Sequence, residues 1–151
     1  MIGVSDHRGK QIDLRRSLAR TGSAHKRKTV LFVDDECLWL DAVKAAVHGG
    51  PVDVITAGGG EEALATMTSN TPDLILSDVR MPVMNGFDLF EKVKCIPKLA
   101  SIPYVFMSSI DDFDARKTAK EIGADDYVEK PFDVGGVRSI LTELLDRFYE
   151  P

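Results

Sequence analysis

From residue 29 onward, short apolar runs alternate with longer stretches in which apolar and polar residues are mixed. Short runs rich in β-branched and other apolar side chains are typical of strands, and continuous runs are typical of strands buried on both sides. Five such runs predict strands, at residues 30–33, 52–56, 73–77, 103–107 and 127–129.

The stretches between these runs carry apolar residues at helical spacing and end at residues that stop helices. Gly49-Gly50-Pro51 is a strong breaker, and Gly123 suits the C-terminus of a helix. The predicted helices span residues 37–48, 60–70, 87–94, 111–122 and 137–149.

Five strand–helix units in regular alternation indicate an α/β fold in which a five-stranded parallel sheet is doubly wound, with helices on both faces. The runs at 30–33, 73–77 and 103–107 are apolar almost throughout, which agrees with strands covered on both sides. Residues 1–28 lie outside the alternation, so we divide the chain into a leader, 1–28, and a domain, 29–151.

Polar side chains collect where the predicted strands end. Because ligands of doubly wound sheets bind at the carboxyl ends of the strands, these side chains are expected to converge on one edge. They are three carboxylates, one hydroxyl and one ammonium: Asp34, Asp35, Asp78, Ser108 and Lys130.

This combination favours phosphoryl chemistry. Close carboxylates raise one another's pKa unless a cation lies between them, and hard oxygen ligands suit Mg²⁺. Lys130 and Ser108 suit the oxygens of a transferred phosphoryl group, and a carboxylate can then act as the nucleophile. A single Asp at a strand end is usually a turn former or a helix cap, so the prediction depends on all five residues together.

Three segments resemble the signature stretches of response-regulator receiver domains from two-component and phosphorelay signalling. They are residues 33–36 (VDDE), 78–86 (DVRMPVMNG) and 123–132 (GADDYVEKPF). The resemblance covers residues 29–149 and implies the flavodoxin-like strand order 2-1-3-4-5, which the pattern alone does not establish.

The resemblance implies a role for each residue at the metal and phosphoryl site. Asp78 resembles the phosphorylated aspartate, and Asp35 the direct ligand of Mg²⁺ beside it. Asp34 would reach the metal through water, and Arg80 would offer its backbone carbonyl. Arg80 and Ile110 also stand at positions that tune the phosphoryl lifetime in the family, and the bulk of Ile110 favours slow loss.

The resemblance also implies a conformational switch and a docking surface. Ser108 occupies the switch position, Lys130 the invariant-lysine position, and Tyr127 that of the aromatic switch residue. The Lys130–Pro131 bond is usually cis in the family. Two aromatic residues are candidates for docking the phosphodonor, Trp39 and Phe132, and Trp39 equally suits the core because it shares a helical face with Val43 and Ala46.

The chain has a net charge of −5, and this charge is distributed unevenly between the leader and the domain. Residues 1–28 hold eight Lys/Arg and two Asp, so the leader carries +6, and the remaining 11 basic and 22 acidic residues give the domain −11. An acidic body repels nucleic acid, so direct nucleic-acid binding by the domain is not expected. The leader is interpreted as a flexible tail, with folding on an acidic partner, anionic lipid or the acidic domain as alternatives. Without a membrane-length apolar run or a signal peptide, we expect a cytoplasmic location.

The function expected from the sequence is a stand-alone receiver, since Glu150-Pro151 end the chain. A histidine kinase or histidine phosphotransfer protein would supply the phosphoryl group, and the output would be a protein contact or onward phosphotransfer. The alternative is a receiver-shaped binding module that works without phosphorylation. An enzyme acting on external substrates is disfavoured, because His7, His25 and His48 lie far from the motifs. The kinase, target, stimulus and any phosphorylation-dependent dimer stay open.

Overall fold

The computed structural model describes residues 3–5, 11–13, 27–130 and 133–149. Two short strands near the N-terminus, β1 (Gly3–Ser5) and β2 (Gln11–Asp13), pair antiparallel as a separate two-stranded sheet. The remaining strands and all of the described helices make up the second unit, which carries the predicted site.

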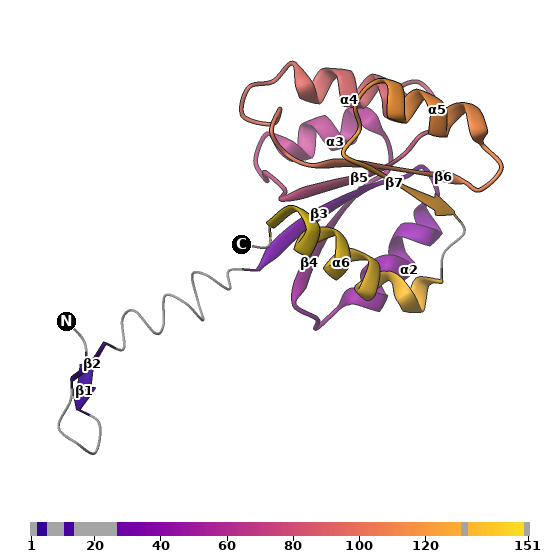
Figure 1. Ribbon diagram of the computed structural model, residues 1–151. Coiled ribbons are helices and arrows are strands. Elements are labelled where there is room, and N and C mark those ends of the chain that lie inside the picture. The colour runs from indigo at the N-terminus through magenta and orange to yellow at the C-terminus, as the bar shows by residue number, and fades with distance from the viewer. Residues whose placement is uncertain (1–2, 6–10, 14–26, 131–132, 150–151) are drawn as a thin grey trace.

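The second sheet has five parallel strands in the order β4-β3-β5-β6-β7, which is the predicted order 2-1-3-4-5 (Figure 1). The strands are β3 (Lys28–Val33), β4 (Val52–Ala57), β5 (Leu74–Asp78), β6 (Tyr104–Ser109) and β7 (Asp126–Lys130). Strands β3, β5 and β6 therefore occupy the centre, where both faces of a parallel sheet must be covered. Their nearly continuous apolar sequences follow from that position.

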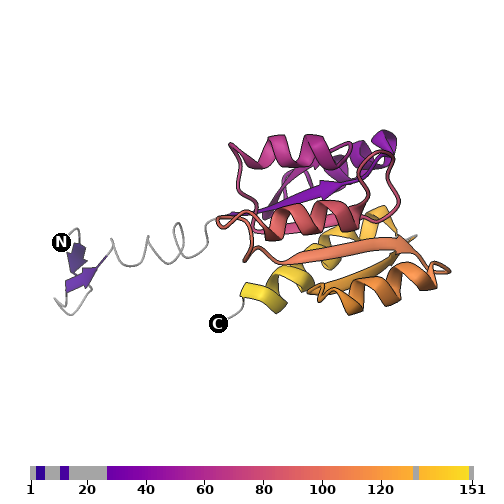
Figure 2. The ribbon, with the colours of Figure 1, turned by 90° about the horizontal axis from the view of Figure 1, so that it is seen from above.

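Helices cover both faces of this sheet, as Figures 1 and 2 show. One face carries α3 (Gly60–Met67), α4 (Gly86–Lys94) and α5 (Phe113–Glu121), and the other carries α2 (Cys37–Val47) and α6 (Val137–Tyr149). A short 3-10 turn, η2 (Val134–Gly136), leads into α6. No helix among the described residues is long and apolar enough to cross a membrane.

The core consists of two apolar layers, one on each side of the sheet. Alternate strand residues point to opposite faces, so Leu31 and Val33 join the layer under α3, α4 and α5, whereas Val30 and Phe32 join the layer under α2 and α6. All four side chains are fully buried. This packing fixes the ends of the central strands, where the polar residues lie.

Two predicted helix boundaries are wrong by a few residues. Helix α3 ends at Met67 rather than at residue 70, and α5 begins at Phe113 rather than at residue 111. The later start of α5 has a clear cause, because the carboxylate of Asp112 accepts a hydrogen bond from the backbone N–H of Ala115 and so caps the helix.

The loop between β5 and α4 is held tightly against the end of β5. The N–H of Gly86 donates to the carbonyl of Val79 over 2.9 Å, and Asn85 caps α4 in a reciprocal capping box with Asp88. A Cβ atom on Gly86 would lie 2.2 Å from the carbonyl oxygen of Asp78, so only glycine permits this approach. Val83 in the same loop is exposed and has φ of 69°, a conformation that costs a β-branched residue about 1–2 kcal/mol.

Candidate functional site

The strand order brings the five predicted polar residues to one edge of the sheet. Asp34 and Asp35 follow β3, Asp78 ends β5, Ser108 is the penultimate residue of β6, and Lys130 ends β7. Because β3, β5, β6 and β7 are consecutive neighbours, these positions form one contiguous row.

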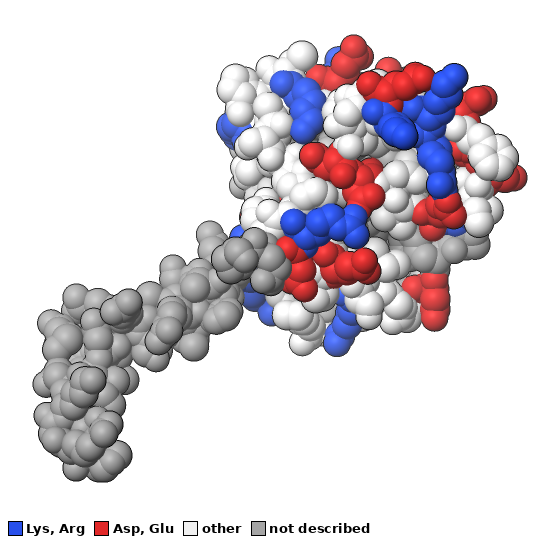
Figure 3. Space-filling view, in the orientation of Figure 1, with Lys and Arg blue, Asp and Glu red and all other residues white. Residues whose placement is uncertain are grey.

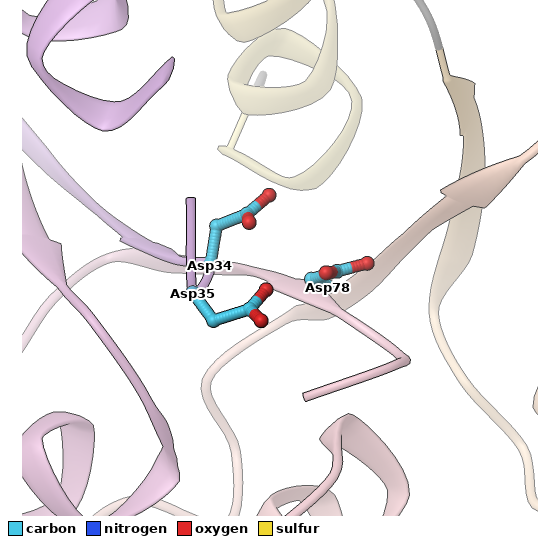
Figure 4. Close-up of side chains that lie close together, drawn as sticks. All are labelled: Asp34, Asp35 and Asp78. Carbon is cyan, nitrogen blue, oxygen red and sulfur yellow. The ribbon is translucent and has the colours of Figure 1, made fainter. Parts of the chain in front are cut away.

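The three carboxylates form a compact acidic cluster. Asp34, Asp35 and Asp78 each offer an oxygen, and these oxygens lie within 4.8 Å of one another. Figure 4 shows the two side chains that follow β3 beside Asp78 at the end of β5. Asp34 is fully buried and Asp78 nearly so, whereas Asp35 is exposed. The cluster is therefore buried at Asp34 and Asp78 and accessible to solvent at Asp35.

Lys130 lies between the two buried carboxylates. Its Nζ is 2.5 Å from Oδ2 of Asp34 and 3.7 Å from Oδ1 of Asp78. The other oxygen of Asp34 accepts the backbone N–H of Glu36 over 2.9 Å. The same Nζ lies 4.9 Å from the centre of the Trp39 ring, within cation–π range. The ammonium compensates part of the negative charge of the Asp34 and Asp78 carboxylates and can also interact with other anionic oxygens that bind beside them.

The pKa of Asp78 is raised to about 6, chiefly by burial; the charge of Lys130 lowers it, and the neighbouring carboxylates of Asp34 and Asp35 add to the upward shift that this value already includes. Three acids next to one ammonium leave an excess of negative charge. Carboxylate oxygens in such a group are the ligands that Mg²⁺ prefers, so the donor set fits a hard divalent cation at Asp34, Asp35 and Asp78.

We predict that Asp78 destabilises the protein near neutral pH when no divalent cation is bound. Its pKa of about 6 in the folded state lies above the value of about 3.9 for a free Asp, so the folded state binds more protons between these values. Stability from this group is therefore lost as pH rises through that window, by about 1–2 kcal/mol after a discount for screening by water.

Thermal melts of wild type and Asp78→Asn at pH 4 to 8 test this prediction. The variant is expected to melt higher above pH 6, with the difference vanishing near pH 4. Mg²⁺ is expected to raise the melting temperature of wild type at pH 7 and to have little effect on Asp78→Asn. A difference in melting temperature between the two proteins that stays constant from pH 4 to pH 8 would contradict this prediction.

Ser108 is buried, and its hydroxyl donates to Oδ2 of Asp112 over 2.9 Å. Arg80 holds the same carboxylate by a two-pronged ion pair, with Nε and Nη2 each 2.9 Å from an oxygen. The guanidinium and these hydrogen bonds hold the pKa of Asp112 well below its usual range. Asp112 is not among the site residues predicted from the sequence, because its only local signal is that of a helix cap.

Tyr127 and Trp39 are both partly buried beside the core. The Tyr127 ring packs against the layer under α5 and lies 5.2 Å from the Arg116 guanidinium, and its buried hydroxyl has no hydrogen-bond partner among the described residues. Trp39 packs edge-on against Phe32, with 5.7 Å between ring centres.

Ile110, the residue that follows the end of β6, is exposed. Two residues with predicted roles, Pro131 and Phe132, lie outside the described residues.

The molecular surface carries both signs of charge side by side on the face shown in Figure 3. Ion pairs join Arg116 to Glu129 on β7, and Arg147 on α6 to Asp126. These pairs link α5 to β7 and β7 to α6.

The row of side chains is suited to one kind of reaction. Asp78 offers a nucleophilic oxygen, and Lys130 offers fixed positive charge 3.7 Å away. Asp34 and Asp35 place two further carboxylates beside it, in a group whose oxygens could hold a cation. A nucleophilic carboxylate next to fixed positive charge is the arrangement required for attack on an anionic electrophile such as a phosphoryl group.

Residues 30–142 match the family model of the response regulator receiver domain. Among curated proteins, the chain is similar to the DNA-binding transcriptional regulator NtrC of Salmonella typhimurium, with 33% identity over 125 residues, which are 83% of this chain and 26% of that protein. It is also similar to the gliding motility regulatory protein of Myxococcus xanthus, with 38% identity over 107 residues, which are 71% of this chain and 14% of that protein.

Solved structures match over most of their length. Chemotaxis protein CheY4 of Vibrio cholerae superposes with a TM-score of 0.71 at 29% identity, covering 79% of this chain and 99% of that one. A response regulator of Chloroflexus aurantiacus, described as putative, superposes with a TM-score of 0.71 at 30% identity, covering 81% and 100%. By contrast, the chain spans about a quarter of the length of the NtrC relatives that it matches.

Proposed function

Since this chain belongs to the response regulator receiver family, we propose that it accepts a phosphoryl group on Asp78 and signals through the resulting conformational change. The observation that carries the proposal is the position of Asp78 at the end of a central strand, with the ammonium of Lys130 3.7 Å away and two further carboxylates beside it. The phosphodonor in this proposal is a histidine kinase or a histidine phosphotransfer protein, in the cytoplasm.

In the transfer, an ionised oxygen of Asp78 attacks the phosphorus of a phosphohistidine. The phosphorus–nitrogen bond breaks, and the ring nitrogen keeps the electron pair and takes up a proton. The product is an acyl phosphate. Lys130 stabilises the charge on the transferred oxygens, as a fixed cation does in other phosphoryl transfers.

Mg²⁺, when bound, supplies positive charge to the phosphoryl oxygens at the acidic cluster. The residues that would hold it are Asp35 and Asp78 directly, Asp34 through water, and Arg80 through its backbone carbonyl. The compact group of carboxylate oxygens supports this assignment.

Signalling is proposed to follow from a shift between two conformations that exist before phosphorylation. Ser108 would turn toward the phosphoryl group, and Tyr127 would move with it and change the face made by α5, β7 and α6. The buried hydroxyl of Tyr127 lacks a hydrogen-bond partner among the described residues. A buried polar group without a partner is energetically unfavourable, which supports a movement of this side chain in the switch. The output is proposed to be a protein contact or onward phosphotransfer.

Acetyl phosphate, a small donor, tests the proposal. Wild type with Mg²⁺ is expected to gain the mass of one phosphoryl group, and EDTA is expected to abolish the gain. No gain in a folded protein would favour the phosphorylation-independent binding module instead. The decay of the product measures its lifetime, for which Arg80 and Ile110 are the proposed tuning positions, and Ile110→Glu is expected to shorten it. An unchanged lifetime in that variant would remove Ile110 from the account.

Trp39 is proposed to contact the phosphodonor, together with Phe132. Its place next to Lys130 supports this role, although its contact with Phe32 also gives it a packing role. Trp39→Ala is expected to slow phosphotransfer from a histidine protein about tenfold, as loss of an aromatic interface anchor does, while phosphorylation by acetyl phosphate stays unchanged. An equal loss with both donors, or an unfolded variant, would assign Trp39 to the core alone.

A further inference from the structure

The hydroxyl of Ser108 is committed to a partner outside the acidic cluster. A hydroxyl carries one hydrogen, and in this conformation the hydrogen points to Oδ2 of Asp112, 2.9 Å away. Ser108 is 2% exposed, so it has no competing bond to bulk water. While this bond lasts, Ser108 cannot donate to a phosphoryl oxygen on Asp78.

The acceptor of this bond is held in place from two other elements. Arg80, which follows β5, contacts both oxygens of Asp112, and the N–H at Ala115 of α5 donates to Oδ1 over 3.1 Å. The Asp112 side chain is 14% exposed although it is charged. Each oxygen therefore accepts two hydrogen bonds, and the carboxylate has no freedom to follow Ser108 if the serine turns away.

We propose that Asp112, clamped by Arg80, is a positioning residue that retains the Ser108 hydroxyl in the unphosphorylated protein and thereby sets how readily the receiver adopts its phosphorylated conformation. The inference rests on the proposed function of Asp78. It adds a restraint on the resting state, carried by two side chains 32 residues apart in sequence.

The restraint has a measurable consequence for binding at Asp78. A ligand that needs the Ser108 hydroxyl can bind only after the bond from Ser108 to Asp112 is broken. The apparent affinity of the ligand is therefore its intrinsic affinity multiplied by the fraction of molecules in which that bond is broken. A hydrogen bond to a charged group shifts such an equilibrium by roughly tenfold. Release of the hydroxyl therefore makes binding tighter, whereas ordinary damage to the structure makes it weaker.

Asp112→Asn is the substitution that separates this role from helix capping. An asparagine whose Oδ1 still accepts the Ala115 N–H keeps the cap of α5. Its neutral amide nitrogen then stands where Oδ2 stood and cannot accept the Ser108 hydrogen, so the charge-assisted bond that retained the hydroxyl is lost, and a hydrogen bond from the amide to Ser108 Oγ is a weaker replacement. The hydroxyl hydrogen is set free, and the Arg80 Nε–H loses its acceptor.

The experiment is calorimetric titration of the full chain with beryllofluoride and Mg²⁺, a mimic of the phosphoryl group, on wild type, Asp112→Asn, Ser108→Ala and the double variant. Asp112→Asn is expected to bind about fivefold to tenfold more tightly than wild type. In the Ser108→Ala background the same substitution is expected to change affinity less than twofold. Arg80→Gln, at a largely exposed side chain, is expected to act in the same direction as Asp112→Asn.

Three results would overturn the inference. The first is an Asp112→Asn variant that binds beryllofluoride no more tightly than wild type. The second is an equal gain in affinity from Asp112→Asn in the Ser108→Ala background. Either result would reject the restraint by Asp112 while leaving the proposed function intact. Failure of folded wild type to bind beryllofluoride at all would instead reject the proposed function, and the inference with it.

Discussion

Lys130→Ala is expected to slow phosphoryl transfer from acetyl phosphate to Asp78 by about a hundredfold or more. The ammonium lies 3.7 Å from the Asp78 carboxylate, and loss of one such preorganised charge typically costs about 10²–10³ in rate. The measurement is the rate of phosphoryl incorporation by intact mass at saturating Mg²⁺. Lys130→Arg keeps the charge and serves as the matched control, with a much smaller loss expected.

The same variant separates a role in chemistry from a role in folding. Without Lys130, the buried carboxylates of Asp34 and Asp78 lose their shared cation, and removal of one partner of a buried ion pair costs about 3 kcal/mol. The loss of stability is expected to be larger at pH 8 than at pH 5, where Asp78 takes up a proton. A folded Lys130→Ala protein that is phosphorylated within threefold of the wild-type rate would contradict the assigned role.

Gly86→Ala is expected to lower the free energy of unfolding by about 3 kcal/mol or more. The added Cβ would stand 2.2 Å from the backbone oxygen of Asp78 and 3.1 Å from Oγ of Ser77, and backbone cannot rotate away as a side chain does. Relief of the clash requires the loop to move off β5, which breaks the bond from Gly86 to Val79.

Urea unfolding of Gly86→Ala beside Gly136→Ala measures this effect. A Cβ on Gly136 would meet nothing within 4 Å, so the control is expected to keep or slightly raise the stability of wild type. Gly86→Ala is also expected to be phosphorylated more slowly, because the displaced backbone belongs to Asp78 itself. Equal stability of the two variants would show that the loop does not hold the end of β5 as described.

Sequence patterns predicted the strands and the polar row well because both depend on local signals. A central parallel strand must be apolar along its length, and its carboxyl end is marked by the first polar residue, as Val33 followed by Asp34 shows. The strand order was available only through the resemblance to a known family, since alternating units do not specify which strands are neighbours. The structure confirms that order.

The contacts of Ser108 could not be predicted in the same way. They depend on Asp112 starting a helix one turn beyond the strand, and on Arg80 reaching it from a different loop. Neither residue has a periodic signal, and an Arg–Asp pair 32 residues apart is one of many that the composition allows. Side-chain pairing between loops is decided by the assembled fold, so it appears only when the strands have been placed side by side.

Chemical mapping of the modified residue shows whether Asp78 carries the phosphoryl group. The protein is phosphorylated with acetyl phosphate and Mg²⁺, then reduced with borohydride, which converts an aspartyl phosphate to homoserine, and digested for peptide mass spectrometry. Homoserine is expected at position 78, and no phosphoryl gain is expected in Asp78→Ala. A phosphoryl group mapped to any other residue, or an undiminished gain in Asp78→Ala, would contradict the phosphorylation of Asp78.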